Sequence, residues 1–225
     1  MFKVIILTVM PELMPNDFDT LLSLVSPEKQ KRIKQFHSFR DAQNCLLGDI
    51  LARIEICHAT GLGKKQLEFS SNAYGKPFLV NNTHIHFNIS HTDGYVVCAV
   101  ADQSVGVDIE LMKSVDMKIA KRFFMPDETA YIMAGDNICR FYEVWTKKES
   151  RMKWEGKGLY KPLTSFSVLA LNHYERIYYH EAFKNEKVIC HVCSKEQEPP
   201  TIRRVDTDSI MRNIMSLCRT KGRGT

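Results

Sequence analysis

Residues 86–111 read HFNISHTDGYVVCAVADQSVGVDIEL, and this stretch decides the fold. It divides into three strands joined by tight turns. Up to Ile89 every second residue is apolar, which is typical of a half-buried strand. Asp93-Gly94 is a hairpin turn signal, and the apolar run 95–101 indicates a strand covered on both faces. We therefore predict an antiparallel meander here.

The third strand of this stretch carries two acids. Asp108 and Glu110 project from one face, while the apolar residues between and beside them project from the other. Carboxylates this close repel each other, and Mg²⁺ compensates such a pair well. The first and third strands of a meander run the same way, so Ser90 and His91 should lie level with the acids. The alternative is a solvated polar face without a metal. If Asp108 and Glu110 are the only evidence, this alternative is favoured.

Composition narrows the class of protein. The chain has 225 residues, enough for one domain or two small ones, and a formal charge of +5. That charge suits anionic ligands or an acidic partner but is too small to indicate nucleic-acid binding. Seven cysteines at irregular spacing favour a reducing cytoplasm over a disulfide framework. The apolar segment 4–10 is too short to span a membrane, so we expect a cytoplasmic protein and a first strand there.

The segments before the meander contain further candidates. Ser26-Pro27 begins a helix whose Lys29 and Arg32 either grip a phosphate or form a solvated basic face, the second being favoured for this segment alone. A longer helix is predicted over 40–60. The loop Gly75-Lys76-Pro77 leads into the meander and is expected to overhang the same site.

A helix predicted over 138–154 carries a third acid. Glu149 falls on its apolar stripe, where a carboxylate is costly unless it is paired or bound to a metal. Lys153 follows four residues later on the same face. An edge-of-core ion pair and a third metal ligand explain Glu149 equally well on this pattern.

The rest of the chain completes an α+β pattern. Other helices are expected over 117–124 and from Pro126 to Met133, strands over 165–171, 176–183, 187–193 and 201–205, a helix over 208–218, and a disordered tail over 219–225. Cys190 and His191 lack a second ligand pair and are expected in the core. Helices followed by antiparallel strands occur twice, so we predict two similar halves, 1–104 and 105–225, with a ligand between them.

Three motifs, taken in order, resemble those of the 4′-phosphopantetheinyl transferases, most closely the Sfp-type branch. They are Asn88-Ile-Ser-His91, Gly106-Val-Asp-Ile-Glu110, and the stretch 145–159, which reads WTKKESRMKWEGKGL. The similarity covers nearly the whole chain and is weakest after Leu171. It implies the fold of that family: a monomer of two pseudo-symmetric halves, each an antiparallel sheet packed with helices.

The resemblance also implies a reaction. Such an enzyme moves the 4′-phosphopantetheine arm of coenzyme A to a serine of an apo peptidyl or acyl carrier protein. It depends on Mg²⁺ and releases 3′,5′-ADP, as in nonribosomal peptide and antibiotic biosynthesis. Two other functions stay open. One is another Mg²⁺-dependent phosphoryl or nucleotidyl transferase, and the other is a non-catalytic coenzyme A binding module.

Residue roles follow from the motif positions. The resemblance implies Mg²⁺ ligation by Asp108, Glu110 and Glu149, with Glu149 also the candidate base, directly or through a metal-bound water. Lys153 matches a lysine beside the leaving phosphate. The implied coenzyme A contacts are, besides Lys153, Ser90 and His91 at the phosphates, Gly75, Lys76 and Pro77 at the adenine, and Lys29 and Arg32 near the 3′-phosphate. Asn44 and Cys45 depart from the pattern of close relatives, which leaves more of the 3′-phosphate contact to Lys29 and Arg32.

Overall fold

The computed structural model describes residues 1–9, 11–63, 66–158, 161–169 and 176–219, without the side chains of 215–219. In chain order its elements are β1 (Phe2–Thr8), α1 (Pro15–Leu22), α2 (Pro27–Ile33), α3 (Phe39–Thr60), β2 (Phe69–Ser71), β3 (Pro77–Leu79), β4 (His86–Thr92), β5 (Tyr95–Ala101), β6 (Gly106–Leu111), α4 (Lys118–Phe123), α5 (Pro126–Met133), α6 (Asn137–Glu155), a 3₁₀ turn (Leu163–Ser165), β7 (Tyr178–Lys184), β8 (Val188–Ser194), β9 (Thr201–Asp206) and α7 (Thr207–Arg219).

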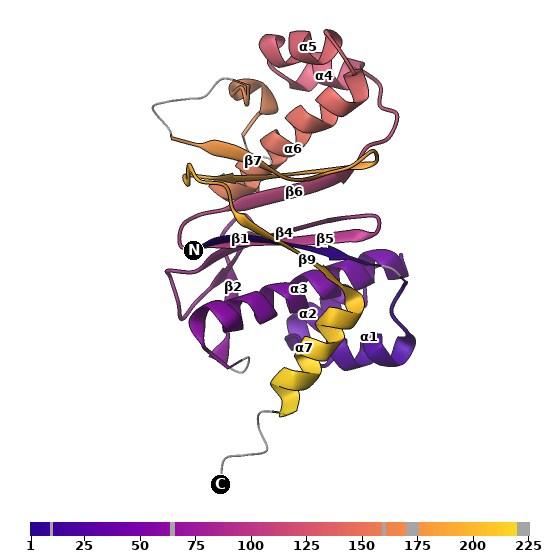
Figure 1. Ribbon diagram of the computed structural model, residues 1–225, viewed down its shortest axis with the longest axis vertical. Coiled ribbons are helices and arrows are strands. Elements are labelled where there is room, and N and C mark those ends of the chain that lie inside the picture. Colours follow the sequence, from indigo (N-terminus) through magenta and orange to yellow (C-terminus); the bar gives the residue numbers. More distant parts are fainter. Residues whose placement is uncertain (10, 64–65, 159–160, 170–175, 220–225) are drawn as a thin grey trace.

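Two sheets form the centre of the molecule and helices cover their outer faces (Figure 1). The first sheet has the strand order β4-β5-β1-β9, and the second has the order β6-β8-β7. Strands β2 and β3 form a separate hairpin. Helices α1, α2, α3 and α7 lie on the first sheet, and α4, α5 and α6 lie beyond the second. The α+β class and antiparallel-dominated sheets predicted from the sequence are confirmed.

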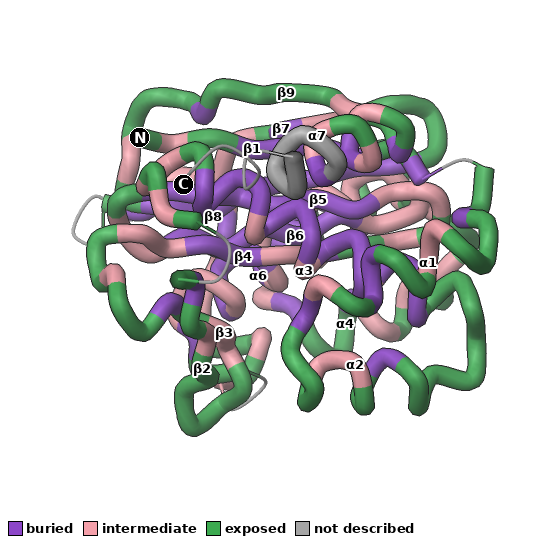
Figure 2. Tube along the Cα trace, turned by 90° about the horizontal axis from the view of Figure 1, so that it is seen from below, coloured by how far each residue is buried: buried purple, intermediate pink, exposed green. Residues whose placement is uncertain are grey.

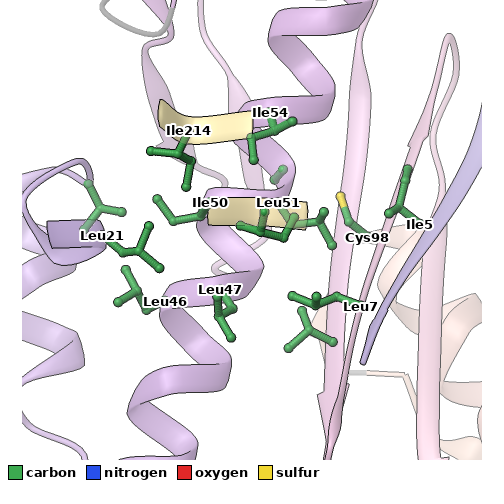
Figure 3. Close-up of a cluster of buried hydrophobic side chains, with 14 of the residues drawn as sticks. Ile5, Leu7, Leu21, Leu46, Leu47, Ile50, Leu51, Ile54, Cys98 and Ile214 are labelled. Carbon is green, nitrogen blue, oxygen red and sulfur yellow. The ribbon is translucent and has the colours of Figure 1, made fainter. Parts of the chain in front are cut away.

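Strand β5 organises the packing because both of its faces are buried. Val96 and Cys98 face the helices and join a cluster with Ile5 and Leu7 of β1 and the apolar side of α3 (Figure 3). Val97 on the opposite face joins a second cluster with β6 and β8, between the two sheets. Burial on both sides explains why residues 95–101 are apolar without alternation.

The predicted meander is wrong in one respect: β6 does not pair with β5. β5 lies between β4 and β1, so neither of its edges is free, and β6 pairs with β8 in the other sheet. The parallel course of β4 and β6 is nevertheless confirmed. Asn88 Oδ1 accepts from the amide of Val107 at 2.9 Å, and Thr92 Oγ1 accepts from the amide of Leu111 at 3.2 Å. Side chains of β4 thus cover the free edge of β6.

Most of the remaining elements agree with expectation, with three qualifications. The strand expected over 165–171 is wrong in its described part, where a 3₁₀ turn is followed by irregular backbone. Helix α1 and the β2–β3 hairpin were not anticipated. The disordered tail predicted over 219–225 is wrong for Arg219, which still belongs to α7, and its remainder, 220–225, like the end of the 165–171 segment, lies outside the described residues.

Strand β9 and helix α7 pack with the elements that begin the chain. β9 pairs in parallel with β1, and Ile210 and Ile214 of α7 join the cluster that contains α3. Figure 2 shows β9 exposed along the rim of the molecule. The division into residues 1–104 and 105–225 stays a prediction, as does pseudo-symmetry. Among the helices that the structure describes, none combines the length and apolarity needed to cross a bilayer.

Candidate active site

Asp108, Lys153 and Ser90 meet where the edges of the two sheets cross. The Lys153 ammonium lies 2.7 Å from Asp108 Oδ1 and 2.9 Å from Ser90 Oγ, which itself donates to Asp108 Oδ1 at 3.0 Å. Asp108 is 3% exposed, so its charge requires this compensation. Its second oxygen, Oδ2, is buried and has no hydrogen-bond partner among the described residues. One acceptor therefore remains available to a further ligand.

Glu110 and Glu149 share the electrostatic environment of Asp108. Desolvation and then the charge of Asp108 raise the pKa of Glu110 to about 7. The same two causes raise the pKa of Glu149, although Lys153 opposes them. Mutual repulsion of this kind is expected when carboxylates gather without a cation. Within the described residues, however, no three His, Cys, Asp or Glu side chains form a group that could hold a metal ion.

Helix α6 brings Glu149 and Lys153 to Asp108. Asp136 caps its start by accepting from the amide of Cys139, and Gly156 ends it in the left-handed conformation with φ +69°. The helix lies against Gly106 so closely that a Cβ there would lie 2.9 Å from the carbonyl carbon of Lys153. Glycine at 106 therefore sets how near α6 approaches the strand that bears the acids.

A pocket of about 290 Å³ opens beside this cluster. One wall comes from the β2–β3 turn, with Gly75 and Pro77, and the other from α6, with Glu149, Lys153 and Gly156 at its end. Lys76 also borders the pocket, but its ammonium donates to the carbonyls of Val105 and Trp154, each at 3.1 Å.

A second pocket of about 400 Å³ lies on the other side of the same turn. Gly75, Pro77 and Ile89 line both pockets. Lys29 and Arg32 line the second, as does Arg53, whose guanidinium pairs with Asp49 and lies 4.6 Å from the centre of the Phe69 ring. Glu28 and Asp49 also line this pocket, so its three cations leave it with a net charge of +1, which suits an anionic ligand such as a phosphate.

His91 and Asn44 line neither of the two pockets. Desolvation and then the charge of Lys153 lower the pKa of His91, which also responds to Lys29 and Asp108. Asn44 is buried, and its amide nitrogen donates to the carbonyl of Thr92 at 3.3 Å. Asn44 Oδ1 has no partner among the described residues.

Two further buried ionisable residues, Glu128 and His191, have structural roles. Glu128, at the start of α5, accepts from the amide of Met125 and pairs with Lys148 at 2.8 Å, both side chains being fully buried. His191 contacts Thr146 Oγ1 through Nδ1 at 2.8 Å, and burial lowers its pKa to about 3. Cys190 and Cys193 are buried in β8 as free thiols, as predicted.

The structure thus brings together residues from segments far apart in sequence. Ser90, Asp108 and Lys153 are in contact; Glu149 and Lys76 line the pocket beside them; Lys29 and Arg32 lie in the adjoining pocket. Sequence reasoning missed Asn88 and Arg53. Arg53 follows Asp49 by four residues on a helix, a spacing that indicates an ion pair but not that the pair lines a pocket.

Comparisons with known proteins identify the family that the chain resembles. Residues 12–103 match the family model described as 4′-phosphopantetheinyl transferase, N-terminal, and residues 104–208 match the 4′-phosphopantetheinyl transferase superfamily. The chain is 42% identical over 153 residues to the 4′-phosphopantetheinyl transferase Sfp of Bacillus subtilis (strain 168), which covers 67% of this chain and 68% of the relative.

Other relatives extend the similarity. The chain is 38% identical over 171 residues to the 4′-phosphopantetheinyl transferase gsp of Aneurinibacillus migulanus, covering 75% of this chain and 71% of the relative. It is 28% identical over 169 residues to the L-aminoadipate-semialdehyde dehydrogenase-phosphopantetheinyl transferase of Saccharomyces cerevisiae (strain ATCC 204508 / S288c). The aligned residues cover 70% of this chain and 62% of the relative. This chain therefore belongs to the 4′-phosphopantetheinyl transferase superfamily and is an enzyme of the Sfp type.

Proposed function

We propose that this enzyme transfers the 4′-phosphopantetheine arm of coenzyme A to a serine hydroxyl of an apo carrier protein and releases 3′,5′-ADP. The observation that carries the proposal is the cluster of Asp108, Lys153 and Ser90, whose Lys153 lines one pocket, with a second, basic pocket on the other side of the β2–β3 turn. Two neighbouring pockets with cations in their walls suit a phosphorylated nucleotide with a long arm.

The acids of the site have the chemistry of magnesium ligands, although among the described residues they are not gathered closely enough to form a metal-binding group. Asp108 Oδ2 is a buried acceptor without a partner among the described residues, and Asp108 raises the pKa of Glu110 and of Glu149. Oxygen ligands with uncompensated negative charge are those that Mg²⁺ prefers. We propose Asp108, Glu110 and Glu149 as its ligands. The ion would offset the charge that develops on the pyrophosphate as the bond to the leaving group breaks.

The chain's own groups account for the remaining chemistry. Lys153 is the cation beside the departing phosphate, because its ammonium is already held at Asp108 and Ser90 on the pocket wall. Lys29, Arg32 and Arg53 surround the second pocket, where the 3′-phosphate is proposed to bind. We propose that Gly75 and Pro77 hold the adenine and that His91 helps to hold the phosphates.

We propose a transfer step in which one bond to phosphorus forms and one breaks. The serine oxygen of the carrier protein bonds to the β-phosphorus of coenzyme A, and the bond from that phosphorus to the bridging oxygen breaks. The electron pair leaves with 3′,5′-ADP. We propose that Glu149, which lines the pocket, accepts the serine proton.

The partners are proposed at the level of class. Peptidyl and acyl carrier proteins supply the serine, as in nonribosomal peptide and antibiotic biosynthesis, and we propose that the enzyme acts as a cytoplasmic monomer. The mild basic excess of the chain, +5, favours carrier domains with an acidic surface.

Intact-protein mass spectrometry tests the proposal. An apo peptidyl carrier protein incubated with the enzyme, coenzyme A and Mg²⁺ should gain the mass of one phosphopantetheine arm, and EDTA should prevent the gain. Asp108→Asn should lose transfer while it still melts cooperatively. Asp102→Asn, which changes a carboxylate in the turn before β6, is the matched control and should retain the activity.

Two results would overturn parts of the proposal. Full activity of Asp108→Asn would remove the metal assignment. Release of 3′,5′-ADP without any gain of mass on a panel of peptidyl and acyl carriers would point to another phosphoryl-transfer reaction in the same site.

A further inference from the structure

Lys76 does not direct its charge into the pocket that its loop lines. The ammonium donates to the carbonyls of Val105 and Trp154 at 3.1 Å each, and it lies 3.4 Å from Ser104 Oγ. Desolvation is the main reason that the pKa of Lys76 falls to about 8. Trp154 belongs to the last turn of α6, whose carbonyls carry the negative end of the helix dipole and favour a cation there.

A second bond joins the same two segments. The side-chain nitrogen of Asn72 donates to the carbonyl of Gly156 at 2.8 Å, and its Oδ1 accepts from the amides of Tyr74 and Lys76 at 2.9 Å each. Asn72 therefore both closes the β2–β3 turn and ties it to the end of α6. The Lys76 side chain also packs on Gly156, because a Cβ at that glycine would lie 2.9 Å from Lys76 Cδ.

These contacts join the two walls of the pocket beside Lys153. One wall is the turn with Gly75 and Pro77, and the other is the α6 end with Glu149 and Gly156. We propose that Lys76 and Asn72 form a latch that fixes the spacing of these walls, so that Lys76 is a positioning residue and its ammonium does not contact the ligand's phosphates. The latch itself does not depend on the proposed function. Only the identification of coenzyme A as the ligand of the pocket rests on it.

The latch has a measurable consequence in the ligand-free protein. In Lys76→Met the side chain keeps all but the last atom of its length and loses the three donors of the ammonium, so the turn and the end of α6 separate more often. Hydrogen exchange should then accelerate at the amides of 72–76 and 153–156 and stay unchanged in the β4–β5 turn at 92–95. Asn72→Asp keeps the Oδ1 acceptor and loses the donor to Gly156, and it should accelerate the same two segments.

Asn82→Asp is the matched control for Asn72→Asp. Asn82 accepts from the amide of His84 through Oδ1 in the next turn of the chain and lines neither pocket. It should leave exchange at 72–76 and 153–156 unchanged. If one of the two segments, 72–76 or 153–156, exchanges at the wild-type rate in both Lys76→Met and Asn72→Asp, the latch is overturned. This holds whatever the enzyme's substrate is.

Binding measurements separate positioning from direct contact. If the pocket is correctly spaced only about a tenth of the time without the latch, Lys76→Met should bind coenzyme A and dephospho-coenzyme A each about tenfold more weakly. Its turnover at saturating coenzyme A should stay within about threefold of the wild type. A loss confined to coenzyme A would overturn the proposal in favour of a direct contact with the 3′-phosphate. If the wild type binds neither nucleotide, the proposed function fails while the exchange result stands.

Discussion

Gly106→Ala tests whether the approach of α6 to β6 sets both stability and catalysis. The added Cβ would lie 2.9 Å from the carbonyl carbon of Lys153 and closer still to the carbonyl oxygen of Ser150 and the amide nitrogen of Trp154. Ordinary contact begins at 3.4 Å, so α6 must retreat by at least ~0.5 Å. All three obstacles are backbone atoms and cannot rotate away.

The expected loss of stability follows from the cost of overpacking. Overpacking costs up to about 3 kcal/mol in well-packed cores, and a chain of this size loses about 2–4 °C of melting temperature per kcal/mol. At the upper end of that cost, about 3 kcal/mol, the melting temperature should fall by about 6–12 °C. The same retreat moves Glu149 and Lys153 away from Asp108, and displacement of this order can lower turnover by about 100-fold.

Differential scanning calorimetry and the carrier-protein mass assay measure the two effects. Gly63→Ala is the control, because among the described residues its Cβ meets only the movable Gln66 side chain, at 3.3 Å, and both properties should be preserved. A Gly106→Ala enzyme that melts within about 1 °C of the wild type and turns over normally would show that α6 yields without cost, and would refute the reasoning.

Three further predictions concern charge. The pKa of Glu110 is raised from 4.5 to about 7, so the folded protein holds that proton more tightly than the unfolded chain, and the stability it contributes is present below pH 4.5 and lost as pH rises through 7. In EDTA, the difference in melting temperature between the wild type and Glu110→Gln should decrease as pH rises from 4.5 to 7. A difference that does not change with pH would contradict the raised pKa of Glu110. Lys153→Met leaves Asp108 without its cation, so added Mg²⁺ should raise the melting temperature of this variant more than that of the wild type, and equal shifts would contradict competition for Asp108. Glu128→Gln should cost about 3–5 kcal/mol by leaving Lys148 charged and unpaired, and the double variant Glu128→Gln/Lys148→Met should recover part of the loss in urea unfolding, which an additive result would rule out.

Local pattern was sufficient to predict most of the elements. The apolar run of β5 corresponds to two covered faces, whereas in β4 the alternate polar residues Asn88 and Ser90 are also buried, on the side of β6. Ser26 and Gly61 bound their helices as capping chemistry requires. Strand pairing was not predictable in the same way. Nothing in 86–111 reveals that β1 already occupies the second edge of β5, because that depends on a segment about 90 residues away.

The sequence was sufficient to predict the acids as candidate site residues. It was not sufficient to predict how they are arranged relative to one another. Period-two spacing placed Asp108 and Glu110 on one face, and helical spacing placed Glu149 above Lys153. That Lys153 contacts Asp108, and that Lys76 turns toward Val105 and Trp154, depends on how closely α6 lies on Gly106. The spacing of residues along the sequence does not reveal such packing distances.

The pairing of β1 with β9 has a consequence for synthesis. Lys3 lies opposite Thr201, so β1 receives its last partner only after nearly the whole described chain has left the ribosome. Until then its outer edge is open to pairing with other strands. Closing so long a segment is also slow, because the entropy of loop closure must be met before the contact is formed. We therefore expect a nascent chain stopped before Thr201 to depend on chaperones, and release of the C-terminal segment to be the step that makes the first sheet complete.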